Sequence, residues 1–278
     1  MNYKVIKKHK CFDGETFFGE HESFATKTRM SFSVFLPCSV ERIDSAIIWL
    51  SGLTCNEENF ITKAGVQALL AGTKTMVICP DTSPRNLNIK GEDESYDFGT
   101  GAGFYVNATT ENFSKNYNMY DYIKNDLVEL LKNDFKVNNI SIFGHSMGGH
   151  GALVIGLRNN DIFKSISAFS PIVNPTNCEW GKKALLGYLG DDTEAWKDYD
   201  ACELIKSGHR IKSPILIDQG LADDFYPEQL LTKNLENIVE KLEVDVKINY
   251  REGYDQSYYF ISTFLKNHID FHLKYLSS

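Results

Sequence analysis

Short apolar runs alternate along the chain with longer amphipathic segments. The runs bounded by turn-forming residues predict strands, and they fall at 27–37, 45–52, 75–81, 139–144, 165–171, 214–220 and 244–250. Apolar positions at helical spacing predict helices, and these fall at 57–71, 117–135, 147–158, 228–242 and 257–275. Strands alternating with helices predict an α/β fold with a mostly parallel sheet covered on both faces.

No linker, repeat or low-complexity segment divides the 278 residues, so we expect a single domain over 1–278. The longest stretch without a predicted element is the Gly-rich, polar segment 82–116. Loops of this length inside a compact domain usually carry function. We therefore expect this loop to lie near the functional site.

The chain carries 29 Lys and Arg against 37 Asp and Glu, a net charge of −8. This balance argues against nucleic acid or an anionic membrane as a partner. No apolar run approaches the roughly 18 residues that a membrane span needs. The first residues lack the apolar stretch of a signal peptide, and the six cysteines show no zinc-type spacing, which together predict a cytoplasmic protein with reduced thiols and no metal.

The end of the strand at 139–144 carries the pattern Gly144-x-Ser146-x-Gly148, followed by a predicted helix. A Gly-x-Ser-x-Gly between a strand and a helix is typical of a nucleophile elbow, which lifts the serine above the sheet. Ser146 is therefore the predicted nucleophile. The backbone N–H groups of Met147 and of Leu53, in the loop after strand 45–52, are the predicted oxyanion donors.

The acid of a triad should follow a later strand, and the histidine should follow the last one. Asp223 and Asp224 both follow strand 214–220, and Asp223 is the preferred candidate. The segment after the last strand, "NYREGYDQSYYF", contains no histidine. Catalysis by a Ser-His-Asp triad therefore lacks its base at the expected place.

Six motifs, taken together, resemble S-formylglutathione hydrolases of the esterase D type over nearly the whole chain. They are "WLSGLTCNEENFITKAG", "ESYDFGTGAGFYVNAT", "FGHSMGGHGAL", "NPTNCEWGKKAL", "ILIDQGLADDF" and "EGYDQSYYFISTFLKNHIDFHLKYL". The resemblance implies an α/β-hydrolase fold and a cytosolic thioesterase that releases formate and glutathione in formaldehyde detoxification. It also implies that no cofactor is needed, and members of the family are often dimeric.

The resemblance also implies roles for single residues. Ser146 and Asp223 match the family nucleophile and acid, and Leu53 and Met147 match the oxyanion donors. Cys55 matches a cysteine beside the site, and Trp180 matches a residue near the substrate pocket. The family motif Gly-Tyr-Asp-His-Ser-Tyr-Tyr-Phe has its catalytic histidine where this chain has Gln256. Because an amide cannot accept a proton near neutrality, we expect strongly impaired turnover.

None of the seven histidines is expected to replace the missing base. His268 and His272 lie far down the closing helix, and His209 precedes its strand. His145 belongs to the elbow, but its side chain is expected to point away from that of Ser146. His150 is expected to pack below the site, and His9 and His21 belong to the early part of the chain.

Aromatic residues are expected to leave room for only a small acyl group, and the candidates are Phe98, Phe104, Trp180, Tyr258 and Tyr259. Positive charge for glutathione would come from Lys63, Arg85, Lys182 or Lys183. Two alternatives to a thioesterase stay open. One is a short-chain carboxylesterase on the same fold, and the other is a non-catalytic protein that binds a thiol or acyl ligand.

Overall fold

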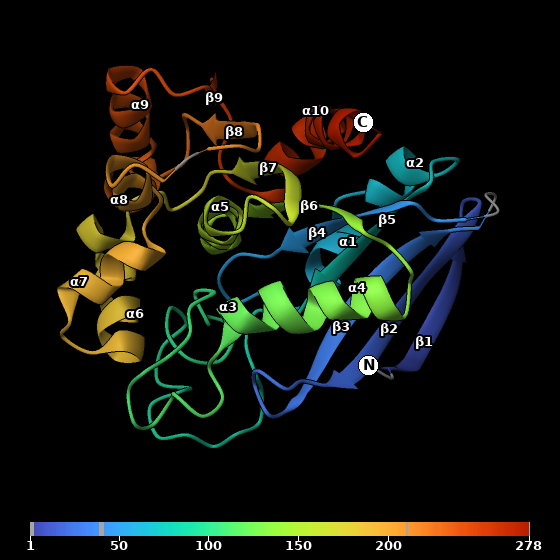
Figure 1. Ribbon diagram of the computed structural model, residues 1–278, viewed down its shortest axis with the longest axis horizontal. Coiled ribbons are helices and arrows are strands. Elements are labelled where there is room, and N and C mark those ends of the chain that lie inside the picture. Colours follow the sequence, from blue (N-terminus) through green and yellow to red (C-terminus); the bar gives the residue numbers. More distant parts are fainter. Residues whose placement is uncertain (1–2, 39–41, 210, 278) are drawn as a thin grey trace.

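The computed structural model describes residues 3–38, 42–209 and 211–277, and a nine-stranded sheet runs through them (Figure 1). The strand order is β1-β2-β3-β5-β4-β6-β7-β8-β9. The strands are β1 Tyr3–Cys11, β2 Gly14–Glu22, β3 Arg29–Pro37, β4 Ser45–Leu50, β5 Thr75–Pro80, β6 Asn139–His145, β7 Phe163–Phe169, β8 Ile215–Gly220 and β9 Val246–Arg251. Strands β5, β4, β6, β7, β8 and β9 pair in parallel, which confirms the predicted α/β fold.

The hairpin of β1 and β2 was not predicted from the apolar pattern. Nearly every residue inside β1 is exposed, and its sequence, YKVIKKHKC, is rich in lysine. An edge strand with one solvated face needs no apolar run, and charge along it discourages pairing with other chains. The two strands pair antiparallel with each other and with β3.

The helices cover both faces of the sheet, as predicted. The α-helices of four or more residues are α1 Glu58–Lys63, α2 Val66–Leu70, α4 Val128–Asn133, α5 Met147–Arg158, α6 Glu179–Leu189, α7 Thr193–Trp196, α8 Ala201–Lys206, α9 Thr232–Lys241 and α10 Tyr258–Leu276. Helices α1, α2 and α10 pack in one apolar cluster, and α4, α5, α8 and α9 pack in the other. Successive residues of a strand point to opposite faces of the sheet, so Ile47 belongs to one cluster and Ile48 to the other.

Two predicted helices differ in detail from the structure. The helix expected at 57–71 is divided into α1 and α2 at Gly65, whose φ of 76° lies in the left-handed region. The helix expected at 117–135 begins as the short α3 Met119–Asp121 and passes through a π-turn at Tyr122–Leu127 before α4. Helices α6, α7 and α8 fill the part of the chain for which no helix was predicted.

The parallel strands bring distant segments to one edge of the sheet. Strands β4, β6, β8 and β9 end at Leu50, His145, Gly220 and Arg251, and the chain leaves all four at the same edge. Ligands of such sheets bind beyond these carboxyl ends. The candidate site is therefore built from the loops that follow them.

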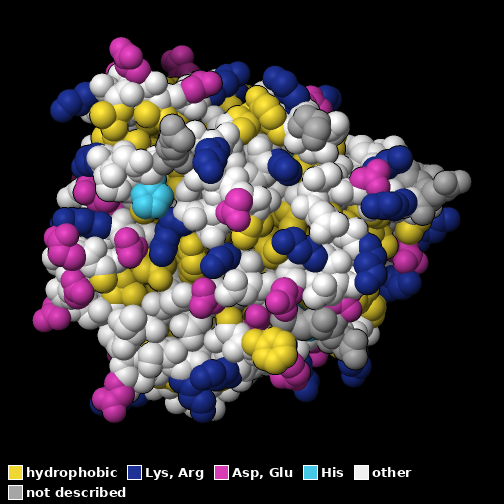
Figure 2. Space-filling model, in the orientation of Figure 1, with side chains coloured by type: hydrophobic (Ala, Val, Ile, Leu, Met, Phe, Trp, Pro, Cys, Tyr) yellow, Lys and Arg dark blue, Asp and Glu magenta, His cyan; other side chains and the backbone are white. Residues whose placement is uncertain are grey.

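The molecular surface has no large area of one charge in the view of Figure 2, where basic and acidic side chains are interspersed. Apolar side chains appear there as separate patches. Within residues 3–38, 42–209 and 211–277, none of the helices has both the length and the apolar character needed to cross a bilayer.

Candidate active site

Ser146 sits on a strained turn between β6 and α5. Its φ of 55° and ψ of −116° are unfavourable for a residue with a Cβ atom. The turn is held by a hydrogen bond from the Ser146 backbone N–H to the carbonyl of Phe169, 3.0 Å away. This conformation places the serine, 5% exposed, at the N-terminus of α5.

The two glycines of the elbow are required by close packing. A Cβ added to Gly148 would lie 2.0 Å from the carbonyl oxygen of Leu50, and one added to Gly144 would lie 2.2 Å from that of Gly148. Both contacts are with backbone atoms, which cannot move aside cheaply. The pattern Gly-x-Ser-x-Gly is thus explained by the approach of α5 to the end of β4.

The predicted oxyanion donors belong to the start of α5 and to the loop after β4. Met147 is the first residue of α5, where backbone N–H groups lack intrahelical acceptors and favour negative charge. Leu53 lies in the loop after β4, and it lines the same pocket as Ser146. This arrangement suits the stabilisation of an oxyanion formed at the Ser146 side chain.

Hydrogen bonds from neighbouring segments fix the loop after β4. The carbonyl oxygen of Cys55 accepts hydrogen bonds from Thr82 Oγ1 at 2.5 Å and from Arg85 Nη2 at 3.1 Å. Arg85 also pairs with both carboxylate oxygens of Asp81, at 2.7 and 2.8 Å. Because its guanidinium is already paired, Arg85 is not a free cation for glutathione, contrary to one expectation from the sequence.

Asp223 lies in the loop after β8 and is 3% exposed. Its Oδ1 accepts hydrogen bonds from the Phe225 backbone N–H at 2.9 Å and from Gln256 Nε2 at 3.2 Å. Burial raises the pKa of this carboxyl, and the Phe225 N–H partly offsets the rise. Asp224, the other candidate, lines a different cavity. The structure therefore brings Asp223, and not Asp224, to Gln256.

Gln256 lies in the loop after β9, just before α10, and lines the pocket that contains Ser146. A histidine here could take a proton from a serine and pass it on. A glutamine amide cannot, because it has no pKa near neutrality. The structure thus brings together the residues predicted as nucleophile and acid, with an amide at the position predicted for the base.

His145 is among the residues that line this pocket, and its side chain lies beside Gly52. A Cβ added to Gly52 would lie 3.2 Å from His145 Nδ1 and 3.2 Å from the Cβ of Ser146. Burial lowers the pKa of His145 to about 4, and groups of Gln256 and Asp255 partly oppose this shift. His145 is therefore a neutral imidazole at pH 7.

The remaining histidines lie away from the pocket, as expected. His150 Nε2 donates to the carbonyl of Phe104 at 2.9 Å in the core below α5. His268 and His272 are buried on α10, where they bond serines of β7. His21 bonds the Tyr122 hydroxyl at 3.0 Å, and His9 and His209 are exposed.

The pocket above Ser146 is small, about 270 Å³. Its lining residues are Gly52, Leu53, Thr54, Cys55, Tyr96, His145, Ser146, Trp180, Phe225, Gln256 and Tyr258. Of the aromatic residues expected there, Trp180 and Tyr258 are present. Phe98 packs on Phe113 and Tyr188 instead, Phe104 is in the core, and Tyr259 is 87% exposed.

Tyr96 and Phe225 complete the aromatic wall and were missed from the sequence. Trp180 Nε1 donates to the Tyr96 hydroxyl at 3.2 Å, and the Trp180 ring lies 4.6 Å from that of Phe225. Tyr96 comes from the long 82–116 loop, so this loop does contribute to the pocket. Tyr96 and Trp180 are far apart in the sequence, so no local pattern indicated that they are in contact.

A second cavity of about 560 Å³ adjoins the first, because Tyr96, Trp180 and Phe225 line both. Its other lining residues are Asp97, Glu179, Lys183, Asp224, Glu228 and Gln229. Lys183 pairs with Asp97 at 2.5 Å, so carboxylates dominate this wall.

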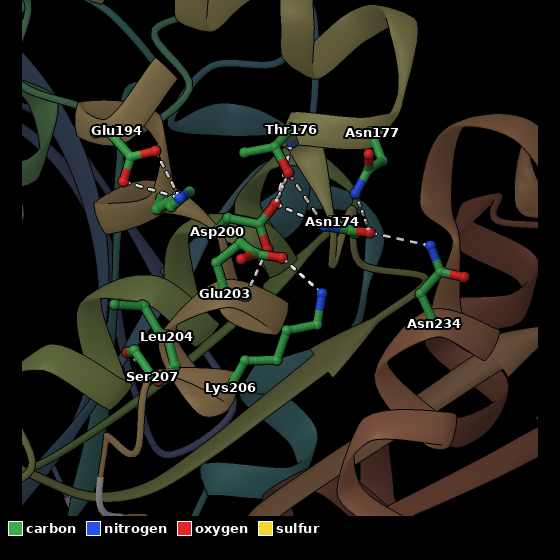
Figure 3. Close-up of polar contacts among 11 residues, drawn as sticks. Asn174, Thr176, Asn177, Glu194, Asp200, Glu203, Leu204, Lys206, Ser207 and Asn234 are labelled. Atoms are coloured by element: carbon green, nitrogen blue, oxygen red, sulfur yellow. Dashed lines mark hydrogen bonds and ion pairs between the residues drawn. The ribbon is translucent and has the colours of Figure 1, made fainter. Parts of the chain in front are cut away.

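A buried polar network holds the segment that leads into α6 (Figure 3). Asp200 is fully buried, and its carboxylate accepts from Asn174 Nδ2 at 2.8 Å and from Thr176 Oγ1 at 2.7 Å. Asn234 of α9 donates to Asn174 Oδ1 at 3.0 Å. These bonds fix the start of α6, and therefore Trp180, relative to α8 and α9.

The described residues hold no group of three or more His, Cys, Asp or Glu side chains arranged to bind a metal ion. All six cysteines are free thiols. Burial raises the pKa of the Cys55 thiol, which keeps it neutral beside Ser146.

Comparison with known proteins gives three consistent results. The family model described as "Putative esterase" matches residues 23–271. The S-formylglutathione hydrolase of Rattus norvegicus is 50% identical over the whole of both chains. That of Arabidopsis thaliana is 48% identical over 98% of this chain and 97% of its own.

Solved structures agree with this. An S-formylglutathione hydrolase from Agrobacterium tumefaciens has a TM-score of 0.94 and 39% identity, covering 98% of this chain and 99% of its own. An S-formylglutathione hydrolase from Staphylococcus aureus is 17% identical with a TM-score of 0.69 over 98% of this chain and 100% of its own, which shows the shared fold.

Proposed function

Because this chain belongs to the S-formylglutathione hydrolase family of esterases, we propose that it hydrolyses S-formylglutathione to formate and glutathione, with turnover limited by Gln256. The observation that carries the proposal is Ser146 on its strained elbow, open to a small pocket and flanked by the oxyanion loop.

Ser146 Oγ attacks the formyl carbon as its proton passes to water, and the carbonyl oxygen becomes an oxyanion held by the N–H groups of Leu53 and Met147. Collapse of this intermediate breaks the carbon–sulfur bond and releases glutathione as a thiolate. Water then attacks the formyl-enzyme and releases formate. A thiolate is a good leaving group, since a free thiol has a pKa of about 8.5, so the departing sulfur needs little help from an acid.

The two cavities suit the two parts of this substrate. The formyl group is small, and it fits the narrow pocket formed by Leu53, Cys55 and Trp180 above Ser146. The glutathione part extends past the ring of Trp180 into the second cavity. There the carboxylates of Glu179 and Glu228 attract the ammonium group of the γ-glutamyl residue, while Lys183 is already paired with Asp97.

Gln256 preserves the shape of the site but not its proton transfer. Loss of the base of a Ser-His-Asp triad costs on the order of a million-fold in rate, while binding and the oxyanion hole retain about 1,000- to 10,000-fold over water. We therefore expect a slow hydrolase that still binds its substrate well. We also propose a cytoplasmic homodimer, for which sedimentation of the purified chain is the direct measurement.

Steady-state hydrolysis of S-formylglutathione by the chain and by Gln256→His tests the proposal. The histidine variant is expected to turn over several orders of magnitude faster. Adding Ser146→Ala to that variant is the matched control and should abolish the gain. A Gln256→His variant that is no faster than the unmodified chain would contradict the assignment of position 256.

A non-catalytic binding protein is the second candidate, and Gln256 is the observation that favours it. Titration with S-methylglutathione, which has no bond to hydrolyse, measures binding alone. Binding without turnover even in Gln256→His would favour this role. A short-chain carboxylesterase would instead hydrolyse p-nitrophenyl formate faster than the glutathione thioester in the same variant.

A further inference from the structure

We propose that the turn after β7, residues 169–172, is a clamp that holds Ser146 in its strained conformation, and that His268 of α10 sets the position of this clamp. The turn is called the β7 turn below. His268 is then a positioning residue for the nucleophile, and it lies outside the pocket lining. The inference rests on the proposed function, because it takes Ser146 to be the nucleophile of that reaction.

The β7 turn contacts both backbone groups of Ser146. The Ser146 N–H donates to the carbonyl of Phe169 at 3.0 Å, and the Ser146 carbonyl accepts from the N–H of Ile172 at 3.3 Å. A non-glycine backbone with a φ of 55° persists only where the surrounding contacts hold it. The β7 turn therefore supplies two of the contacts that keep the nucleophile on its elbow.

The β7 turn is itself strained, so its position also depends on its surroundings. Ser170 has a φ of 41°, in the left-handed region that favours glycine. Its backbone N–H donates to the carbonyl of Asp218 in β8 at 2.8 Å. The Asp218 carboxylate is fully buried and accepts from Asn249 Nδ2 at 2.7 Å and from Arg251 Nε at 3.0 Å. These bonds tie the turn to β8 and β9.

Helix α10 contacts the same turn through an aromatic stack. The His268 ring lies on the ring of Phe169, with 3.8 Å between the centroids and 22° between the planes. Phe260, in the first turn of α10, meets the Phe169 ring edge-on at 5.6 Å. These side chains are fully buried, and a close-packed core transmits a displacement from one ring to the next. Because Phe169 also holds the Ser146 N–H, only two contacts separate His268 from the nucleophile.

Two polar contacts fix the orientation of the His268 ring. Nδ1 lies 2.8 Å from Ser167 Oγ, and Nε2 lies 3.8 Å from Oδ2 of Asp218. A lone pair on Nε2 would be repelled by the carboxylate, so we assign the proton of the neutral ring to Nε2 and let Nδ1 accept from the serine. Rotation of the ring would disturb both contacts. The imidazole therefore presents a fixed face to Phe169.

His272 offers a close comparison, because it lies four residues further along α10 and is equally buried. Its Nε2 lies 2.8 Å from Ser167 Oγ, and its Nδ1 lies 2.7 Å from Ser165 Oγ. Its ring meets Phe143 of β6 edge-on at 5.3 Å and is not stacked on the β7 turn. The two histidines thus share a helix, a depth and a serine partner, and they differ in the stack.

Substitution of His268 in the Gln256→His background tests the clamp. Titration of Ser146 with a fluorophosphonate counts the active sites, so kcat is expressed per active site. His268→Leu removes the stack, and we expect kcat per site to fall about 30- to 100-fold with KM unchanged, because a displaced reacting atom costs up to about 100-fold. His268→Phe keeps a flat ring against Phe169 and should retain kcat within about threefold.

His272→Leu is the matched control. It removes an equally buried imidazole from α10, so it should lower the midpoint of urea unfolding as His268→Leu does, yet leave kcat per site unchanged. Phe169→Leu removes the same stack from the other side, and it serves as a second variant if His268→Leu does not fold. In the double variant the loss of kcat should be no larger than in either single variant, because both remove one contact.

The unmodified chain gives a measurement that does not depend on a base at position 256. The rate at which the fluorophosphonate modifies Ser146 should fall in His268→Leu of the unmodified chain as it does in the Gln256→His background. A fall confined to Gln256→His would overturn the proposal, because it would show that His268 acts on residue 256 through the start of α10.

Three other outcomes would overturn it. Equal losses of kcat per site in His268→Leu and His272→Leu would indicate a general loosening of α10. A His268→Phe variant as slow as His268→Leu would show that the stack does not position the serine. Unchanged kcat per site in both His268→Leu and Phe169→Leu would show that the clamp needs no contact with α10. If Gln256→His fails to hydrolyse S-formylglutathione while the fluorophosphonate still modifies Ser146, the proposed function fails, and the modification rates still test the clamp.

Discussion

Gln256 Nε2 donates a hydrogen bond to Asp223 Oδ1 across 3.2 Å, joining the loop after β8 to the segment before α10. The contact links the two positions at which a triad would hold its acid and its base. The glutamine therefore takes over the bond to the carboxylate that a histidine would make. The glutamine cannot become positively charged, however, so the Asp223 carboxylate has no cation to stabilise at this position.

Asp223→Asn should consequently have very different effects in two backgrounds. In Gln256→His we expect kcat to fall by about 10,000-fold, because the acid orients the imidazole and stabilises its charged form. In the present chain no imidazolium forms at position 256, so we expect a loss of about tenfold or less. Hydrolysis of S-formylglutathione measures both.

Asp224→Asn is the matched control for this experiment, because Asp224 is adjacent in sequence but lines the second cavity. It should change kcat little in either background. A loss from Asp223→Asn that is equally large with glutamine and with histidine would show that the carboxylate acts on something other than residue 256.

The architecture was predictable because buried parallel strands appear in the sequence as short, continuous apolar runs. The apolar runs at 45–52, 75–81 and 139–144 correspond to β4, β5 and β6 in the centre of the sheet. β1 was missed because it is a solvated edge strand rich in lysine. The left-handed backbone conformation of Gly65 divides one predicted helix in two. A glycine permits this conformation, but its presence in the sequence does not predict it.

The site was predictable where topology alone places a residue. The strand-end rule places Ser146, Asp223 and Gln256 in loops at one edge, and the structure has all three loops there. The partnership of Tyr96 with Trp180 was not predictable, since 84 residues separate them. The position of His145 beside Gly52 in the pocket lining could not be read from the motif.

Trp180→Ala should widen the acyl pocket. Trp180 forms its wall together with Phe225 and Tyr96, so removal of the indole leaves room for longer acyl chains. In the Gln256→His background we expect the preference for formyl over butyryl thioesters to fall about tenfold or more, as the three additional carbons of butyryl become tolerated. Trp196→Ala removes an indole that bonds the Gly190 carbonyl outside the pocket, and it should leave the preference unchanged. An unchanged preference in Trp180→Ala would place the acyl group elsewhere.

Gly148→Ala should destabilise the whole domain. Its Cβ would lie 2.0 Å from the Leu50 carbonyl oxygen, so the start of α5 would have to move away from β4. We expect a loss of about 3 kcal/mol in the free energy of unfolding, measured in urea. Gly208 has a φ of 86° and no neighbour within 4 Å of an added Cβ, so Gly208→Ala should cost only about 1 kcal/mol. Equal losses would show that backbone conformation, and not the contact with Leu50, determines the cost.

Stability should fall as the pH is lowered below about 6.5, because several histidines are buried in the neutral form. His272 bonds Ser165 at 2.7 Å and Ser167 at 2.8 Å, and burial lowers its pKa well below the usual value. Burial lowers the pKa of His268 as well, and that of His150 to about 4. Unfolding releases these rings to their ordinary pKa of about 6.5.

The direction of this pH dependence follows from the protons that the chain takes up on unfolding. Below pH 6.5 the unfolded chain binds protons that the folded chain does not, so acid favours unfolding. Each such histidine contributes about 1.4 kcal/mol per pH unit until the pH reaches its folded pKa, so these three give a slope of up to about 4 kcal/mol per unit. Urea unfolding at pH 7, 6 and 5 measures the slope. His150→Gln should reduce it by about 1.4 kcal/mol per unit. A free energy of unfolding that is the same at pH 7 and pH 5 would mean that these rings are already protonated, or equally accessible to protons, in the folded protein.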